Sequence, residues 1–267
     1  MRITDRGDPR IAPFVSIRER DLTGGTDGRF IVEGKIPLSI LLSRSRFEVD
    51  CLFLCETRLS PLADLLENLP SHVPVYTAPQ SLMDEIAGFP VHRGVLACAR
   101  KGPVLDLQGF SSCKRLLVLN EISNHDNVGA AFRNAAAFGA EGVVLDAGSC
   151  DPLYRKAIRV SSGSALWLPY HQGGTGLEHI QFLKANGFAI WALTPNPSAP
   201  SLYEQPHPEK LALLLGAEGP GLPQSLIERA EPVRIPMMAG FDSVNVATAG
   251  AIALSYASGA SSSATKR

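Results

Sequence analysis

The chain has 267 residues, of which 45% are hydrophobic and 19% are charged, and this composition excludes an intrinsically disordered chain. The formal net charge of −1 excludes a protein that binds nucleic acid through a strongly basic tail, although a local basic surface stays open. The polar segment Met1–Arg10 lacks the apolar core of a signal peptide, and no apolar run reaches the roughly 20 residues that span a bilayer, so we expect a cytoplasmic protein with no membrane partner.

The first part of the chain predicts an extension followed by a small α/β domain. Residues 1–28 are rich in charges and turn formers, and we expect an N-terminal extension with at most one short helix. Strands and helices then alternate over residues 29–105, where Ser60 and Pro61 suit the cap and the first position of a helix. We expect strands at Phe30–Glu33, Val49–Cys55, Val73–Tyr76 and Gly94–Ala99, and helices at Ile36–Leu42, Ser60–Leu69 and Pro79–Ala87.

A second α/β domain is expected over residues 113–258. Lys101–Lys114 carries Gly, Pro and Ser, which places a boundary there, and residues 259–267 form a polar tail. Strands that alternate with helices predict a mostly parallel sheet covered by helices on both faces. The expected strands are Arg115–Asn120, Gly142–Leu145, Ala165–Leu168, Phe188–Thr194, Leu211–Gly216 and Val233–Ile235, and the expected helices include Asn127–Phe138, one with a capping box of Thr175 and Glu178, and Val244–Ala257.

Three polar segments follow strands of the second domain, at the edge where open α/β sheets bind ligands. The first, Asn120–Arg133, reads NEISNHDNVGAAFR. Asn127 is well placed to cap the helix that follows, which is its plain structural interpretation. Arg133 lies off the apolar stripe of that helix, so it is either a solvated surface charge or a side chain that points into a cleft.

The other two segments follow the last two expected strands. Gly216–Leu222 reads GAEGPGL, whose glycines allow backbone to approach a ligand and whose Glu218 offers a carboxylate; a glycine turn with an exposed Glu is the alternative. It is not a P-loop, because no Gly-Lys-Ser/Thr follows. Ile235–Ala251 reads IPMMAGFDSVNVATAGA, in which Ser243 and Asn245 are both placed to cap a helix of small residues.

In this order and at these spacings, the three segments resemble the motifs of the SpoU/TrmH family of RNA methyltransferases, in the SPOUT superfamily. Val244 stands where Leu is usual in the family. Upstream, FIVEGKIPLSILL and HRGVLACA resemble the start and end of the family's substrate-binding domain, so the resemblance covers roughly Phe30–Tyr256. The matching positions are Asn127, Gly129 and Arg133 in the first motif, Leu213–Leu222 in the second and Ile235–Ala249 in the third.

The resemblance implies an α/β protein with two domains: an RNA-binding domain similar to L30e and L7Ae, then a parallel-sheet domain with a trefoil knot. It implies transfer of a methyl group from S-adenosyl-L-methionine (SAM) to a ribose 2'-hydroxyl of rRNA or tRNA, without a metal. It also implies a homodimer, which the helix Val244–Ala257 suits because its small residues permit close packing.

The resemblance implies roles for individual residues as well. Arg133 is similar to the family's catalytic arginine, and because a guanidinium stays protonated in proteins, we favour stabilisation of the developing alkoxide over action as a base. The other catalytic residues would position this arginine and the target ribose. The implied catalytic residues are Asn127, Arg133, Glu218, Ser243 and Asn245, and the implied SAM-binding positions are Gly216, Ile235 and Val244.

A basic stretch and the cysteines complete the sequence. Arg155, Lys156 and Arg159 lie at helical spacing and form a candidate phosphate-binding face, with a solvated helix face as the equal alternative. The five cysteines form no C-x-x-C pair and no cluster with zinc spacing, so we expect reduced thiols and no metal.

Two other functions compete with this interpretation. A Rossmann-type enzyme expects a Gly-x-Gly turn after the first strand, which LLVLNEISNHDNVG lacks. A non-catalytic RNA-binding protein of the same fold is the main alternative. The joint presence of Arg133, Glu218, Ser243 and Asn245 speaks against it, and a measurement of SAM binding separates the two functions.

Overall fold

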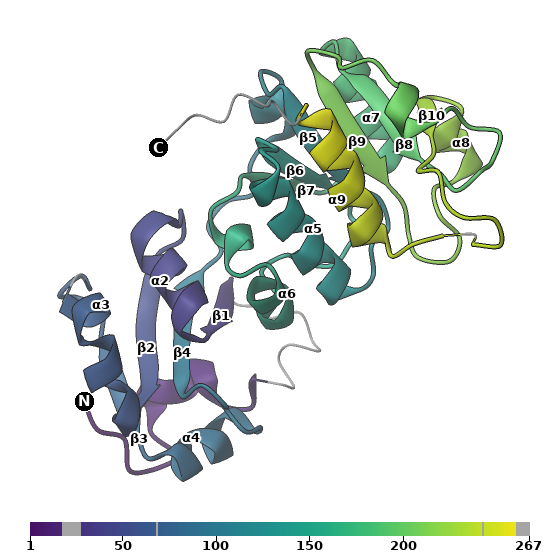
Figure 1. The fold of residues 1–267 in the computed structure, drawn as a ribbon. Helices are drawn as coiled ribbons and strands as arrows, with labels where there is room; N and C mark the ends of the chain where they lie inside the picture. Colours follow the sequence, from purple (N-terminus) through teal and green to yellow (C-terminus); the bar gives the residue numbers. More distant parts are fainter. Residues whose placement is uncertain (18–27, 68, 242, 260–267) are drawn as a thin grey trace, which may run out of the picture. The chain divides into compact units, whose positions relative to one another are not determined.

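The structure, a computed structural model, describes residues 1–17, 28–67, 69–241 and 243–259 (Figure 1). The chain forms two compact units. Unit 1 comprises Met1–Pro103 and Pro152–Trp167, and unit 2 comprises Val104–Asp151 and Leu168–Arg267. The expected mixed α/β class with a parallel sheet is confirmed.

Unit 1 is built on a four-stranded sheet in the order β1-β4-β2-β3. Strand β4 pairs antiparallel with both β1 and β2, and β2 pairs parallel with β3. The strands are β1 (Arg29–Glu33), β2 (Val49–Cys55), β3 (Val75–Ala78) and β4 (Val95–Arg100), and the helices are α2 (Lys35–Arg44), α3 (Ala63–Glu67), α4 (Gln80–Ala87) and α6 (Arg155–Val160).

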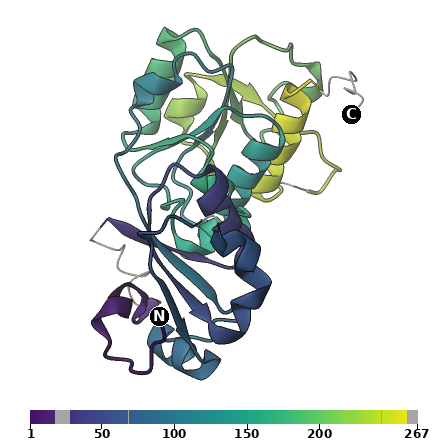
Figure 2. The ribbon, with the colours of Figure 1, turned by 90° about the vertical axis from the view of Figure 1, so that its left-hand side faces the viewer.

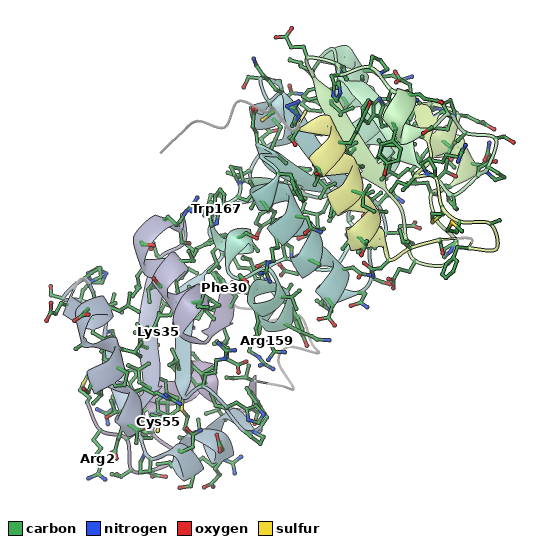
Figure 3. The ribbon with its side chains drawn as sticks, viewed as in Figure 1. Arg2, Phe30, Lys35, Cys55, Arg159 and Trp167 are labelled. Atoms are coloured by element: carbon green, nitrogen blue, oxygen red, sulfur yellow. The ribbon has the colours of Figure 1, made fainter. Side chains whose placement is uncertain are left out.

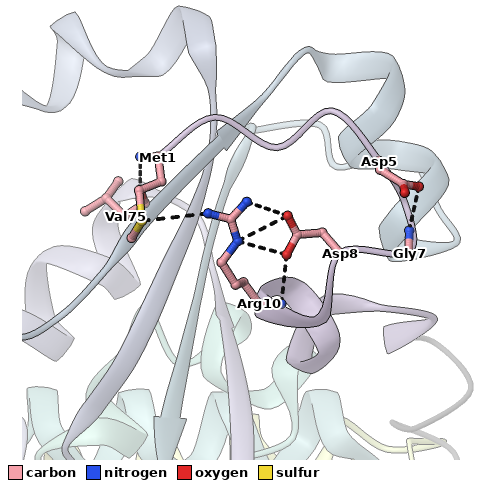
Figure 4. Close-up of polar contacts among 6 residues, drawn as sticks. All are labelled: Met1, Asp5, Gly7, Asp8, Arg10 and Val75. Carbon is pink, nitrogen blue, oxygen red and sulfur yellow. Dashed lines mark hydrogen bonds and ion pairs between the residues drawn. The ribbon is translucent and has the colours of Figure 1, made fainter.

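The beginning of the chain is part of unit 1 and not a separate extension. The Met1 ammonium donates a hydrogen bond to the Val75 carbonyl over 2.7 Å (Figure 4), so this segment runs along β3. Residues 1–17 contain one short helix, the 3-10 helix η1 (Pro9–Phe14), in agreement with the expectation of at most one, and η1 buries its two large apolar side chains in the core. Residues 18–27 of the predicted extension lie outside the described residues.

Unit 2 is built on a six-stranded sheet in the order β10-β8-β9-β5-β6-β7. Every pair of neighbours in it is parallel, as expected. The strands are β5 (Arg115–Leu119), β6 (Gly142–Leu145), β7 (Tyr170–Gln172), β8 (Ala189–Leu193), β9 (Leu211–Leu215) and β10 (Glu231–Val233).

Helices cover both faces of the sheet in unit 2. Helices α5 (His125–Ala137) and α9 (Val246–Ala257) run side by side on one face (Figures 1 and 2). On the other face, α7 (Gly176–Ala185) and α8 (Gln224–Ile227) pack in one apolar cluster with alternate residues of the central strands. Because helices cover both faces of the sheet, polar side chains gather in the loops at the strand ends.

The strand expected at Ala165–Leu168 is wrong. A 3-10 helix, η5 (Ser164–Leu166), overlaps the start of this segment, and the next strand, β7, begins only at Tyr170. The Ser161 and Ser164 hydroxyls donate to carbonyls three residues earlier, over 2.8 and 3.0 Å, which stabilises consecutive tight turns. A short buried apolar run does not by itself distinguish a strand from a helix.

The helix starts were predicted with mixed success. The capping box of Thr175 and Glu178 is confirmed, because the Glu178 N–H donates to the Thr175 hydroxyl and the Thr175 N–H donates to the Glu178 carboxylate. The cap expected at Ser60 is wrong, since Ser60 lies inside the 3-10 helix η3 (Ser60–Leu62) and Leu59 holds the cap position.

The segment Pro152–Trp167 departs from the predicted domain boundaries. By sequence it lies within residues 113–258, yet it packs in unit 1. A Cβ atom on Gly163 would come within 3.2 Å of Ile40, and the Arg44 guanidinium lies 3.7 Å from the centroid of the Trp167 ring. The second expected domain is therefore interrupted by a segment that folds with the first.

Within the described ranges, no helix is long and apolar enough to cross a membrane. All five cysteines are free thiols. Among the same residues, no group of three or more His, Cys, Asp or Glu side chains is arranged to hold a metal ion.

Candidate active site

The three polar segments of unit 2 follow strands of the parallel sheet at its carboxyl edge. Asn120 comes directly after β5, and its N–H donates to the carbonyl of Leu215, the last residue of β9, over 2.9 Å. Because the strands are parallel, the loops that lead into α5 and α9 start from the same edge of the sheet. This edge is where the sequence places its candidate site residues.

Two buried polar side chains, which the sequence analysis missed, hold the loop after β5. Asp146 accepts the Glu121 N–H over 3.0 Å and the Ser149 hydroxyl over 2.6 Å, and the Ser149 hydroxyl accepts the Ile122 N–H over 3.0 Å. These bonds hold Glu121 at a φ of 57°, which is uncommon for a residue with a Cβ atom. Asp146 directly follows the strand Gly142–Leu145, and that position was the available signal.

Asn127 does not cap α5, which corrects its plain structural interpretation. The cap is Asn124, whose side-chain oxygen accepts the Asp126 N–H over 2.9 Å. Asn127 lies in the first turn of the helix and is only 5% exposed. Its amide is therefore available for contacts with residues outside α5.

Asn245 joins two other candidate residues into one hydrogen-bonded group. Its Nδ2 donates to Asn127 Oδ1 over 2.9 Å and to Glu218 Oε1 over 3.0 Å. Its Oδ1 accepts the N–H groups of Ala247 and Thr248 over 2.9 and 3.3 Å, so the expected cap of α9 is confirmed. We refer to Asn127, Glu218 and Asn245 as the polar cluster.

The polar cluster contains a buried donor with nothing to donate to. The Asn127 Nδ2 atom has no hydrogen-bond partner within the described part of the chain. An unpaired buried amide donor costs about 1–3 kcal/mol, so native structures rarely keep one without a use. The Asn127 amide is therefore suited to donate to an oxygen atom of a bound molecule.

The loop that carries Glu218 has no room for a side chain at its base. A Cβ atom on Gly216 would lie 2.5 Å from the Gly221 carbonyl carbon and from the Leu222 nitrogen. The Gly221 N–H donates to the Ala217 carbonyl over 3.1 Å and closes the loop. Glycine is therefore required at this predicted SAM-binding position, because the backbone folds back over it.

The remaining predicted residues of this edge lie outside the polar cluster. Arg133 and Ser243 are exposed, and neither side chain forms a hydrogen bond or ion pair with another described residue. Ile235 is partly buried and Val244 is 40% exposed. The structure thus brings together three of the five predicted catalytic residues.

Asn134 of α5 is a further residue that the sequence analysis missed. Its Nδ2 donates to the Ala247 carbonyl in the first turn of α9 over 2.9 Å. Asn134 follows Asn127 by seven residues, which is two helical turns, so both amides face α9. That spacing was visible in the sequence, and it ties the start of α9 to α5.

The candidate phosphate-binding residues lie on α6 in unit 1. The Arg155 guanidinium forms an ion pair with Glu33 and lies 4.3 Å from the centroid of the Phe89 ring. Its side chain is only 14% exposed, so it is engaged in the interior. Lys156 and Arg159 are the exposed cations of this helix.

Comparisons with known proteins match both the sequence and the fold. Residues 114–255, more than half of the chain, match the sequence model of the SpoU rRNA Methylase family. An uncharacterized tRNA/rRNA methyltransferase of Mycobacterium bovis is 38% identical over 260 residues, which cover 94% of this chain and 89% of that protein.

Two solved structures are similar over nearly the whole chain. The crystal structure of an RNA 2'-O ribose methyltransferase has a TM-score of 0.77 and 26% identity, and the match covers 96% of this chain and 98% of that one. An AdoMet-bound rRNA methyltransferase from Sinorhizobium meliloti has a TM-score of 0.78 and 21% identity, with 96% and 97% covered, and its likeness is one of fold.

Proposed function

The chain belongs to the SpoU rRNA methylase family, and from this premise we propose that it is an enzyme that transfers a methyl group from SAM to a ribose 2'-hydroxyl of RNA. The polar cluster of Asn127, Glu218 and Asn245 carries the proposal, because its hydrogen bonds join three segments that are distant in sequence. A protein that only binds RNA has no need of a buried, unpaired amide donor at this edge. The cluster therefore favours the enzyme over the non-catalytic alternative.

The residues at this edge fit SAM. The tight loop at Gly216 offers backbone groups, Ile235 and Val244 offer apolar surface, and Glu218 offers a carboxylate. Such a combination suits an adenine ring and a positively charged sulfonium group. When bound, SAM supplies an electrophilic methyl group.

The polar cluster orients the ribose. The hydrogen bond from Asn245 to Asn127 Oδ1 fixes the amide orientation of Asn127, so that its Nδ2 is the group left to donate. Glu218 accepts the second hydrogen of the Asn245 amide and fixes that side chain in turn. Asn127 then donates to an oxygen of the target nucleotide and places the 2'-hydroxyl for attack, because fixed orientation lowers the barrier of a displacement.

Arg133 stabilises negative charge on the 2'-oxygen and on the neighbouring phosphate. Its guanidinium stays protonated at neutral pH, which argues against action as a base. It follows Asn127 by six residues, or about 600° of helical rotation, so the two side chains leave α5 in different directions. Arg133 therefore reaches the RNA from the exposed side of α5, and Ser243 contacts the same nucleotide from the loop before α9.

The oligomeric state, the knot and the substrate class complete the proposal. Residues of α9 such as Ile252 and Tyr256, together with Phe138 just after α5 and with Tyr203, line an open hollow of about 750 Å³, and its apolar surface supports a homodimer. We also propose a trefoil knot in unit 2, which the resemblance to the SpoU family supports. rRNA or tRNA is the substrate and the cytoplasm is the location, in keeping with the similarity to a tRNA/rRNA methyltransferase.

A transfer assay tests this function. The purified full chain is incubated with methyl-labelled SAM and with rRNA or tRNA from cells that lack the protein, and the RNA is then digested to nucleosides. We expect the label in a 2'-O-methylated nucleoside. Label on a base, or no transfer to either RNA pool, would contradict the proposal.

A further inference from the structure

Cations from several separate segments meet in unit 1 where β1 ends. Glu33, the last residue of β1, is 5% exposed and pairs with Arg155 of α6. Arg159, one turn further along α6, lies 3.7 Å from the same carboxylate, and its side chain stays 48% exposed. Glu33 thus holds α6 beside β1, while α6 presents a second guanidinium to solvent.

Two further arginines reach this place from other loops of unit 1. The Cβ position of Gly34 lies 3.3 Å from Cδ of Arg93, and the Cβ position of Gly94 lies 3.3 Å from Cγ of Arg58. Each arginine stem therefore packs over a glycine beside β1 or β4. Both arginines are exposed, and neither forms an ion pair with a residue that the structure describes.

Lys35, the first residue of α2, completes the group. It is exposed, and its Nζ donates to the Pro61 carbonyl over 3.2 Å and to no carboxylate among the described residues. Figure 3 labels both Lys35 and Arg159. The basic surface is defined here as the four exposed cations Lys35, Arg58, Arg93 and Arg159.

The basic surface is unusual for this chain. Positive and negative charges nearly balance over the whole chain, which has a net charge of −1. At the basic surface, by contrast, Glu33 is the only carboxylate among the described residues that lies within ion-pair distance of any of the four cations. Glu33 is buried and already paired with Arg155, so it neutralises little of the exposed charge. Like charges held together raise the local positive potential, which favours an anionic ligand.

We propose that the basic surface binds consecutive phosphates of the RNA substrate. The proposal rests on the proposed function, which makes RNA the polyanion that unit 1 meets. Guanidinium groups bind phosphate oxygens in pairs, and separate cations along one surface suit the repeating charge of a nucleic-acid backbone. Such contacts position an RNA without reading its sequence.

The test compares two triple variants of the full chain with equal changes in charge. One replaces Arg58, Arg93 and Arg159 by Gln. The control replaces Arg6, Lys184 and Arg229 by Gln, which are exposed cations outside the basic surface. Binding of a single-stranded 20-nucleotide oligouridine is measured from 0.05 to 0.2 M salt, together with the thermal unfolding of each variant.

The expected result is a change in the salt dependence of binding. Each phosphate contact contributes about 0.7 to the slope of log K against log salt for single strands, so three lost contacts lower the slope by about 2. Taken from 1 M salt, where such contacts contribute little, down to 0.1 M, this slope corresponds to about fivefold in affinity per contact, or about 100-fold weaker binding for three lost contacts. The control variant keeps the slope and the affinity of the unmodified chain.

An unchanged slope in the basic-surface variant, or equal losses in both variants, would overturn the proposal. A loss confined to vesicles containing anionic phosphatidylserine, with oligouridine binding intact, would assign the surface to a membrane instead and overturn it too. Methyl transfer by the unmodified chain tests the proposed function separately. If the unmodified chain transfers methyl groups but the basic-surface variant keeps its slope, only the proposal for the basic surface is refuted. If the variant has a lower slope but the unmodified chain transfers no methyl group, only the proposed function is refuted.

Discussion

Replacement of Asn245 tests whether its two roles, as helix cap and as the centre of the polar cluster, can be separated. In Asn245→Ala, the N–H groups of Ala247 and Thr248 lose their side-chain acceptor, which costs about 1 kcal/mol of stability for a lost cap. The hydrogen bonds to Asn127 and Glu218 are lost as well, at about 1 kcal/mol each. The expected loss in the free energy of unfolding is therefore about 2–3 kcal/mol.

Asn245→Ser keeps one role and removes the other. A serine hydroxyl still caps α9, so only about 1–2 kcal/mol of stability should be lost. The serine is too short to hold Asn127 and Glu218 in place, and misplacement of a reacting group by about 1 Å costs on the order of 100-fold in rate. We expect Asn245→Ser to be more stable than Asn245→Ala and about as inactive.

Urea unfolding and the rate of methyl transfer measure the two roles separately. A matched control is Ser225→Ala, which changes an exposed side chain at the start of α8. Transfer by Asn245→Ser at the unmodified rate would refute the argument that Asn245 orients the polar cluster. Equal stability of the two Asn245 variants would refute its role as the cap of α9.

Four further predictions concern other residues. Arg133→Ala should abolish methyl transfer while the SAM affinity measured by titration calorimetry stays unchanged, because Arg133 acts on the RNA. Arg155→Ala should lower the free energy of unfolding measured in urea by about 3 kcal/mol. This value is at the lower end of the range for a broken buried ion pair, because Arg159 stays 3.7 Å from Glu33. Gly216→Ala should lose SAM binding in calorimetry and about 1–3 kcal/mol of stability, since the added methyl group meets backbone at 2.5 Å. Burial lowers the pKa of His179 below its ordinary 6.5, so the unfolded chain binds the proton more tightly than the folded chain does. As the pH is lowered below about 6.5, the urea midpoint of the unmodified chain should therefore decrease more steeply than that of His179→Gln.

Each of these predictions has an outcome that contradicts it. Full transfer by Arg133→Ala removes Arg133 from the mechanism, and weakened SAM binding moves it to the cofactor. Arg155→Ala with unmodified stability would mean that the pair with Glu33 is not needed in unit 1. Normal SAM affinity in Gly216→Ala would place the cofactor elsewhere. If the unmodified chain and His179→Gln showed parallel profiles of urea midpoint against pH, His179 would not take up a proton on unfolding.

Regular elements and motif positions could be predicted from the sequence. The strands Val49–Cys55 and Gly142–Leu145 have the predicted bounds, because each is an apolar run of strand length with turn formers nearby. Asn245 was predictable as a cap, since it precedes a helix of small residues. Its bonds to Asn127 and Glu218 were not, because they join residues that only the parallel sheet brings together.

Choices between similar neighbours could not be made from the sequence. Asn124 and Asn127 are both suited to cap α5, and only the packing of α5 against α9 decides that Asn127 is buried and Asn124 is the cap. The placement of Pro152–Trp167 depends on the contact of Arg155 with Glu33, which lies 122 residues away in the chain. Local patterns carry no information about such a partner.

A map of 2'-O-methylation in the rRNA and tRNA of cells with and without this protein tests the proposed activity directly. We expect at least one ribose that is methylated only when the protein is present, and whose methylation is restored by the unmodified chain but not by Arg133→Ala or Asn245→Ser. Identical maps in the two cell types, or restoration by both variants, would contradict the proposed function.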